Sequence, residues 1–248
     1  MHTRVDILGV RVSAITPLLA VEEIRTWVKE GRRGYVCIAP VATLVDANRD
    51  QIYRDIVNGA DMVTPDGMPV VWLLHAKGYK DVARTYGPDL MRHLCRTEGL
   101  KHFFFGGTQQ VLGLLEQCLK KDLPGINIVG MLSPPFRTQA TVEDPAVLEA
   151  INRAKPDIIW VGLGSPKQDI WMHLNRPGLD APVMMGVGAA FDFLAGVKAQ
   201  APQFMRQSGL EWLFRLCSEP GRLWKRYLIG NTLFLFYMVK QILKNKKI

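Results

Sequence analysis

Apolar segments alternate with segments of helical periodicity along most of the chain. Short apolar runs typical of β-strands occur at residues 35–39, 61–64, 101–107, 126–130, 157–164 and 181–188. Between them, the spacing of apolar residues predicts helices at 41–59, 68–78, 87–99, 108–125, 142–155, 165–175 and 189–196. Residues 133–137, Ser-Pro-Pro-Phe-Arg, interrupt the pattern and are expected to form a loop.

This repeated strand–helix–strand order predicts an α/β fold. Uninterrupted apolar strands are typical of a parallel sheet with helices on both faces. In such sheets, ligands bind beyond the carboxyl ends of the strands. Asp66, Gly107, Gly164 and Gly188 all follow predicted strands, so we expect them to share one site. Glycines at these points also serve simply to turn the chain.

The sharpest predicted turn carries a carboxylate. Thr64-Pro65-Asp66-Gly67 separates an apolar run from a helix. Asp and Gly both tolerate tight backbone geometry, so a turn alone would explain the pair. The alternative is that the turn presents Asp66 to a bound ligand.

Composition narrows the class of protein. With 248 residues, the chain is long enough for one large α/β domain, or one domain with an appendage. Its four cysteines are far apart and form no Cys-x-x-Cys pair, which is typical of reduced thiols in a cytoplasmic protein and argues against zinc. The first residues lack the apolar run and cleavage site of a signal peptide.

Positive charge is concentrated in the C-terminal part of the chain. Residues 202–248 contain nine Lys or Arg but two Asp or Glu, whereas the whole chain has a net charge of +8. We therefore predict a body, residues 1–201, and a basic helical appendage, residues 202–248, which we call the tail. A basic tail on a nearly neutral body favours an anionic surface as partner.

The tail also carries many aromatic and aliphatic residues. Its longest uncharged run, residues 227–239, has 13 residues, whereas crossing a bilayer takes about 20. Apolar and basic residues together predict a helix lying on an anionic membrane. A helix packed on the body and an apolar contact in a homo-oligomer are the alternatives. No RNP-like or zinc-knuckle motif supports nucleic-acid binding.

The common nucleotide motifs are absent or incomplete. No GxxxxGK[ST] sequence occurs, which argues against a P-loop kinase or ATPase. Residues 186–191, Gly-Val-Gly-Ala-Ala-Phe, begin like a dinucleotide fingerprint, but Phe191 replaces its last small residue and no acidic residue follows at the usual distance. No Asp-x-Asp pair is present, so we expect neither a metal nor a cofactor, and cations and helix N-termini would neutralise any phosphates.

Several longer motifs resemble one protein family. They are TPDGMPVVW, RTYGPDLM, FFFGGT, PDIIWVGLGSPKQDIW, GVGAAFDFLAG and GLEWLFRLCSEPGRLWKRY, and they are spread from about residue 36 to residue 227, a span that makes up most of the chain. In this order they are similar to the WecG/TagA/CpsF family of bacterial glycosyltransferases, which includes N-acetylmannosaminyl transferases of teichoic acid synthesis. The resemblance implies a Rossmann-like fold with a C-terminal helical appendage. It also implies transfer of a sugar from a UDP-sugar donor to a polyprenyl-diphosphate-linked acceptor at the inner face of the cell membrane.

The resemblance assigns roles to individual residues. Asp66 of the Pro-Asp-Gly turn is the expected base, and Thr43, Arg84 and Gln168 complete the expected catalytic set. Arg215 and Arg222 of the tail are expected near the diphosphate. The motifs at the strand ends and in the tail give these expected substrate-binding residues: Gly107, Gly164, Pro166, Lys167, Gly188, Phe191, Asp192, Arg215 and Arg222.

The chain also departs from the family pattern. Many members carry Asn where this chain has Val45, and Glu where it has Asp169. Gln200 stands in place of an arginine, and Gly221 precedes Arg222 where many members have two arginines. The change at position 45 suggests a different sugar, and the change at 200 affects the expected phosphate neighbourhood.

One expected base without a second nucleophilic carboxylate predicts a single displacement with inversion. Two other functions stay open from the sequence. One is an NAD-dependent oxidoreductase, based on residues 186–191. The other is a non-catalytic module that binds a nucleotide-sugar or lipid diphosphate at the membrane.

Overall fold

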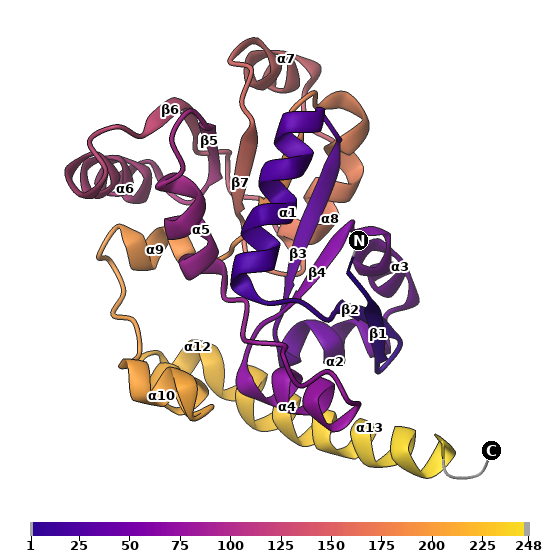
Figure 1. Ribbon diagram of the computed structural model, residues 1–248. Coiled ribbons are helices and arrows are strands. Elements are labelled where there is room, and N and C mark those ends of the chain that lie inside the picture. Colours follow the sequence, from indigo (N-terminus) through magenta and orange to yellow (C-terminus); the bar gives the residue numbers. More distant parts are fainter. Residues whose placement is uncertain (1, 246–248) are drawn as a thin grey trace.

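The computed structural model describes residues 2–245 and has an α/β architecture (Figure 1). Its main sheet has six parallel strands in the order β4–β3–β8–β7–β5–β6. They are β3 (Gly34–Ala39), β4 (Met62–Pro65), β5 (Lys101–Gly106), β6 (Asn127–Leu132), β7 (Ile158–Gly162) and β8 (Val183–Gly186). Each lies where the sequence predicts a strand, and the parallel α/β prediction is confirmed.

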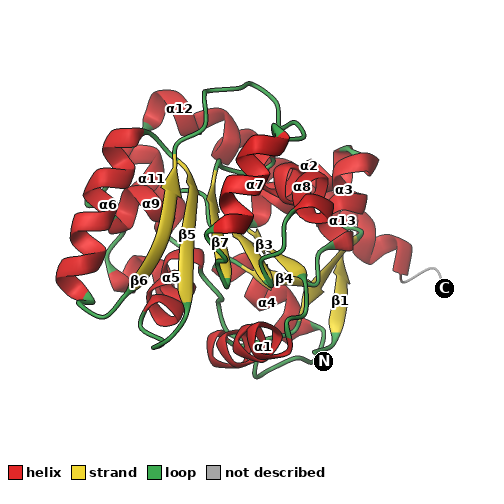
Figure 2. Ribbon diagram, turned by 90° about the horizontal axis from the view of Figure 1, so that it is seen from above, coloured by secondary structure: helices red, strands yellow, loops and turns green. Residues whose placement is uncertain are grey.

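Side chains that alternate along each strand fill a hydrophobic core on either face of the sheet. In β3, Val36 and Ile38 enter one core, whereas Tyr35 and Cys37 enter the other. The first core is covered by α1 (Pro17–Glu30), α5 (Gly87–Cys95), α6 (Gln109–Asp122) and α9 (Ala190–Leu194). The second is covered by α2 (Val41–Arg49), α3 (Gln51–Gly59), α7 (Pro145–Arg153) and α8 (Lys167–Asn175). Figure 2 shows α1 and α5 on one side of the sheet and α3, α7 and α8 on the other.

Side-chain caps fix where several helices begin. Thr108 accepts a hydrogen bond from the backbone N–H of Val111 at 3.2 Å, as expected for the start of α6. The single helix predicted for residues 41–59 is wrong. Asp50 has an extended backbone, and its side chain accepts a hydrogen bond from the N–H of Tyr53 at 3.1 Å. It therefore ends α2 and caps α3, since Asp competes with helix continuation by capping the following turn.

The N-terminal residues form a hairpin that the sequence pattern did not reveal. Strands β1 (Arg4–Ile7) and β2 (Val10–Ser13) are antiparallel. Leu8 and Gly9 between them both have positive φ, 55° and 85°, which is the backbone of a two-residue turn with matching twist. The side chain of Gln241, in the tail, accepts a hydrogen bond from the N–H of Leu8 and donates one to Asp6 at 2.8 Å.

The tail is mostly helical. It contains α10 (Gln203–Gln207), α11 (Glu211–Ser218), α12 (Pro220–Trp224), the π-helical turn η2 (Lys225–Ile229) and α13 (Gly230–Asn245). One face of α13 packs on α2, and Phe234 and Met238 are buried in the same core as the body. On the opposite face, Leu235, Phe236 and Val239 are exposed. The division at residue 201 stays a prediction.

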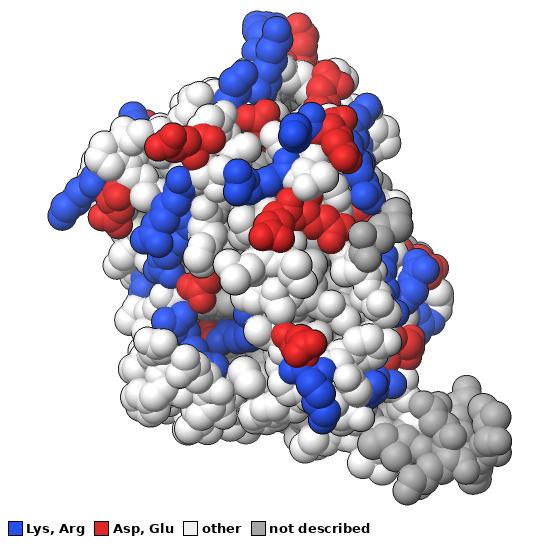
Figure 3. Space-filling model, in the orientation of Figure 1, with Lys and Arg blue, Asp and Glu red and all other residues white. Residues whose placement is uncertain are grey.

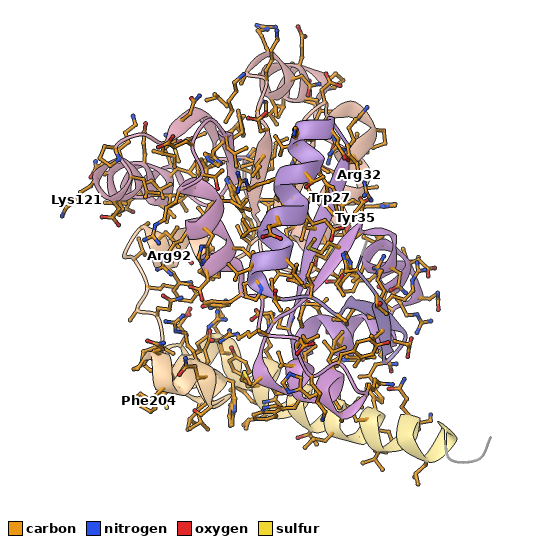
Figure 4. All side chains as sticks on the ribbon, in the orientation of Figure 1. Trp27, Arg32, Tyr35, Arg92, Lys121 and Phe204 are labelled. Carbon is orange, nitrogen blue, oxygen red and sulfur yellow. The ribbon has the colours of Figure 1, made fainter. Side chains whose placement is uncertain are left out.

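The exposed apolar side chains of the tail are joined by others from the body. Trp72 of α4 (Met68–Ala76) is half exposed, and the tail backbone at Gly209 lies so close that a Cβ there would meet the Trp72 ring at 3.0 Å. Phe204 projects from α10 at the lower left of Figure 4. In Figure 3, the surface at the lower left, over α10, is largely uncharged. We call the surface formed by the exposed side chains of Trp72, Phe204, Leu235, Phe236 and Val239 the apolar end.

None of the helices described between residues 2 and 245 combines the length and hydrophobicity that a membrane crossing requires.

Candidate active site

The loops at the carboxyl ends of the strands enclose two connected clefts. Asp66 follows β4, Gly107 follows β5, Gly164 follows β7 and Gly188 follows β8. The large cleft has a volume of about 580 Å³, and the small cleft about 130 Å³. Gly164, Gly188 and Arg222 line both, so the clefts meet there. The structure thus brings the four strand-end residues together at one edge of the sheet, as expected.

The large cleft lies between the ends of β5, β7 and β8 and the loop that follows β6. Seven of the expected substrate-binding residues line it: Gly107, Gly164, Lys167, Gly188, Phe191, Asp192 and Arg222. On the loop, Phe136 is exposed at the rim, with the Lys167 ammonium 4.9 Å from its ring centroid. The Lys167 Nζ also donates to the carbonyl of Arg137 at 3.2 Å, which ties the loop to the start of α8.

Close packing explains why the strand ends carry glycine. A Cβ on Gly106 would lie 2.7 Å from the backbone of Gly162, and Gly106 has a φ of 122°. A Cβ on Gly162 would lie 2.6 Å from the ring of the buried Phe191. Phe191 also packs edge-on against Phe104, with ring centroids 5.8 Å apart. Phe191 therefore supports the cleft from beneath as well as lining it.

Three arginines of the tail line the small cleft. They are the expected Arg215 and Arg222, and also Arg226. The Arg222 guanidinium donates two hydrogen bonds of 2.7 Å to Glu219, which lower the pKa of that carboxyl. Lys198 lies between Glu219 and Asp192, with its Nζ 2.8 Å from an Asp192 oxygen. The mouth of the site is thus positively charged and held by tail contacts.

Asp66 lines the small cleft on the side of β4. Its backbone N–H donates to the carbonyl of Ala39 on β3, and Gly67 after it has a φ of 89°. The Oδ1 atom of Asp66 accepts a hydrogen bond from Arg84 Nε at 2.9 Å. The tight Pro-Asp-Gly turn therefore aims a carboxylate into the cleft, and Arg84 holds it from behind.

Arg84 contacts a second carboxylate, from the tail. Its Nη2 lies 2.6 Å from Glu211 Oε2, and its guanidinium lies over the Tyr86 ring at 4.1 Å. Burial alone would lower the pKa of Arg84, but Asp66 and Glu211 outweigh burial and raise it. Arg84 is thus a permanent cation between two carboxylates.

The start of α8 forms the floor between the clefts. Gln168 is buried and lines the small cleft; its Oε1 accepts from the N–H of Gly164 at 3.2 Å, and its Nε2 donates to Ser165 Oγ at 3.1 Å. Pro166, after a cis peptide bond, lines neither cleft and starts α8. In these positions Gln168 and Pro166 shape the loop around Gly164.

A buried polar layer lies beneath this floor. Asp169 is fully buried and accepts a hydrogen bond from the Tyr53 hydroxyl at 2.6 Å. Thr43, on α2, is also buried and lines neither cleft. The structure therefore places Thr43 in the supporting layer, and direct contact between Thr43 and substrate stays a prediction.

Some residues at the site escaped the sequence reasoning. Glu211 and Tyr86 were not assigned to it, although both stand in or beside the motifs GLEW and RTYGPDLM. Arg226 belonged to the basic tail without a specific role. The folded tail brings Glu211 and Arg226 to the Asp66 side of the site, where the Tyr86 hydroxyl of the body donates a hydrogen bond to Glu211.

Comparison with known proteins assigns the family. A model of the glycosyl transferase WecG/TagA/CpsF family matches residues 5–248. This chain belongs to that family. Among its curated relatives are N-acetylglucosaminyldiphosphoundecaprenol N-acetyl-beta-D-mannosaminyltransferases of Staphylococcus aureus strains MW2 and NCTC 8325 / PS 47. Each is 30% identical over 251 residues, covering 98% of this chain and 95% of the relative.

As a member of the WecG/TagA/CpsF family, the protein is a glycosyltransferase, and the resemblance found in its motifs is confirmed. The alternative function, an NAD-dependent oxidoreductase based on residues 186–191, is not favoured. Gly186 ends β8, and the helix that follows, α9, spans Ala190–Leu194, only five residues. These glycines instead make room for Gln168, whose side chain would lie 2.9 Å from a Cβ on Gly186.

The structure also locates two departures from the family pattern. Val45, on α2, is buried in the core and lines neither cleft. Gln200 accepts a hydrogen bond from Arg92 at 3.3 Å, outside both clefts. Any effect of Val45 or Gln200 on the donor sugar would therefore act through neighbouring residues.

Asp169 generates a prediction about pH and stability. Burial raises the pKa of this carboxyl to about 6, although hydrogen bonds from Tyr53 and other neighbours favour its charged form. The folded state thus binds this proton more tightly than the unfolded chain, so stability is lost as pH rises from about 4 to about 6 and stays lower above that. Asp169→Asn removes a cost on the order of 2–3 kcal/mol at neutral pH while keeping an acceptor for Tyr53.

The difference in melting temperature between Asp169→Asn and wild type should therefore grow in favour of the variant as the pH rises from about 5 to about 7.5. Thermal melts followed by circular dichroism at several pH values would measure it. Parallel curves for the two proteins over this interval would contradict the assignment of a buried, ionising Asp169.

Proposed function

We propose that this glycosyltransferase moves an N-acetylmannosamine-type sugar from a UDP-sugar to a sugar linked to a polyprenyl diphosphate, in the synthesis of a cell-surface polysaccharide or teichoic acid. The observation that carries the proposal is that Asp66 and the arginines of the tail line the same small cleft, with the Asp66 carboxylate paired to Arg84. The activity for which the relatives are named supports the choice of sugar and acceptor.

The chemistry requires a base on one side of the sugar and positive charge on the other. The oxygen of the acceptor hydroxyl forms a bond to the anomeric carbon, and Asp66 accepts the proton that this hydroxyl loses. The bond from that carbon to the β-phosphate oxygen breaks, and UDP leaves with the electron pair. A single displacement of this kind inverts the configuration of the anomeric carbon.

The two clefts suit the two ends of the donor. The large cleft, about 580 Å³, falls within the usual range for a ligand pocket and would hold the nucleoside. Arg222 lines both clefts, so the diphosphate would lie at their junction. The sugar would then enter the small cleft, beside Asp66 and Gln168.

Arginines would neutralise the leaving diphosphate without a metal. Arg215, Arg222 and Arg226 line the cleft, and arginine binds phosphate oxygens in a bidentate manner. Within residues 2–245, no group of three His, Cys, Asp or Glu side chains is placed to hold a metal ion. Fixed cations at the position where charge develops can stabilise the transition state directly.

The acceptor is attached to a lipid, so the protein must work at a membrane surface. We infer that the apolar end docks on the inner face of the cell membrane. Phe204, Leu235 and Phe236 are exposed there, and Lys225 and Lys240 stand exposed on the same tail. Apolar side chains that enter the interface, together with lysines that meet anionic headgroups, are the usual means of such binding.

Asp66→Asn tests the proposed base. Asn keeps the shape of the side chain but cannot take up the proton, so we expect turnover to fall by about 10²–10⁴-fold. UDP release would be measured with a panel of UDP-sugars and a lipid-diphosphate-linked acceptor. Asp122→Asn, the same change at the exposed end of α6, is the control and should retain wild-type turnover.

Acceptor-dependent UDP release that is equal in wild type and Asp66→Asn would remove Asp66 from the mechanism. Nucleotide-sugar binding by wild type without any product would instead support the non-catalytic binding module.

A second experiment tests the membrane-docking surface. A triple variant, Phe204→Glu, Leu235→Glu and Phe236→Glu, should bind vesicles containing phosphatidylglycerol at least about tenfold more weakly than wild type. The matched control is Lys120→Gln, Lys121→Gln and Arg153→Gln, which lowers the net charge equally on exposed parts of α6 and α7. Figure 4 shows Lys121 projecting far from the apolar end.

Equal vesicle binding by the triple variant and the control would contradict docking through the apolar end. Loss of self-association in the triple variant with no change in vesicle binding would show that this surface serves a homo-oligomer instead.

A further inference from the structure

Glu211 is the first residue of α11, yet its carboxylate is directed to the body of the protein. Its Oε2 lies 2.6 Å from Arg84 Nη2, and its Oε1 accepts a hydrogen bond from the Tyr86 hydroxyl at 3.2 Å. The side chain is only 12% exposed. An acidic residue in a first helical turn is common because it interacts favourably with the helix dipole. That interaction requires neither burial nor two partners on the body, so Glu211 has a further role.

All three nitrogens of the Arg84 guanidinium are engaged. Nε donates to Asp66 at 2.9 Å, Nη2 contacts Glu211, and Nη1 donates to the backbone carbonyl of Arg206 at 3.4 Å. The tail therefore holds two of these nitrogens, and Asp66 is held by the third. Tyr86 fixes the plane of the guanidinium, which lies over its ring at 4.1 Å.

We propose that Glu211 is a positioning residue for glycosyl transfer, which acts through Arg84 to orient the Asp66 carboxylate. The inference rests on the proposed role of Asp66 as base. Because the guanidinium is rigid and planar, fixing two of its nitrogens also fixes the direction of the third. Without Glu211, the Arg84 guanidinium loses one of the contacts that fix its direction, and Asp66 loses the rigid partner that orients it.

This role differs from that of an ion pair that only stabilises the fold. A stabilising pair would change the melting temperature and leave the turnover of the folded protein intact. A positioning residue changes kcat, because small displacements of a reacting group cost up to about 100-fold in rate. Binding of the nucleotide, in the large cleft, should hardly change, since Glu211 and Arg84 line neither cleft.

Glu211→Gln is the variant that tests the proposal. It keeps the size of the side chain and an acceptor for Tyr86, but it removes the charge opposite Arg84. We expect kcat to fall by about 10–100-fold, with the donor KM and the Kd for UDP within about twofold of wild type. Glu149→Gln, the same change in an exposed ion pair with Arg153 on α7, is the matched control and should leave kcat unchanged.

A double-mutant cycle tests whether Glu211 acts through Asp66. If it does, Glu211→Gln should have no further effect on the residual rate of Asp66→Asn, because the residue being positioned is already inactive. A full 10–100-fold loss in that background would show an independent role and overturn the proposal. So would a Glu211→Gln enzyme with wild-type kcat, or one whose UDP affinity falls as much as its kcat.

Circular dichroism and UDP binding by each variant show whether it is folded. If Glu211→Gln does not fold, Tyr86→Phe provides a second test, since it removes a hydrogen bond to Glu211 and keeps the ring under Arg84. A smaller fall in kcat, at unchanged UDP affinity, is then expected, and an unchanged kcat would overturn the proposal. Wild-type turnover in Asp66→Asn would refute the proposed base itself, which is a separate outcome from an inert Glu211.

Discussion

The guanidinium of Arg84 joins the body of the protein to its tail at the proposed reaction site. A largely buried cation is tolerated only where carboxylates and other acceptors surround it. Asp66 supplies one carboxylate from the end of a strand, and Glu211 supplies the other from the first turn of α11. The network can form only when both segments are in place. The orientation of the proposed base therefore depends on how the tail packs.

Packing of the tail depends in turn on the two faces of α13. Phe234 and Met238 enter the core beside α2, and Gln241 reaches the N-terminal hairpin. The opposite face leaves Leu235 and Phe236 exposed at the apolar end. One helix thus packs on the body with one face and exposes the proposed membrane-docking side chains on the other. This arrangement links the proposed membrane contact to Arg222 and Arg226 in the small cleft, because α12, η2 and α13 follow one another without a break.

The sheet could be predicted from the sequence because its strands are short apolar runs, and β4, β5, β7 and β8 end at glycine or at an Asp–Gly turn. The same regularity placed Asp66, Gly107, Gly164 and Gly188 at one edge, since parallel strands end on the same side. The parts that escaped prediction depend on contacts between distant segments. Glu211 meets Arg84 across more than one hundred residues of chain, and no local pattern indicates that contact.

Other differences have local causes. Asp50 breaks the helix predicted for residues 41–59 because its side chain caps the following turn, a signal that apolar spacing alone does not register. Thr43 was assigned to the catalytic set through the family resemblance, yet it lies in the buried layer under the clefts. The inner and outer faces of α13 are both apolar, so periodicity could not decide between a packed helix and a membrane-bound one. In the structure, one face of α13 is packed on the body and the other is exposed.

The central claim is a single displacement in which Asp66 takes the proton of the acceptor. The most direct measurement is the configuration of the new glycosidic bond, determined by NMR on product formed from a UDP-sugar of known anomeric configuration. The account predicts a configuration opposite to that of the donor. Retention would require two displacements and a nucleophile in addition to the base, and it would contradict the account.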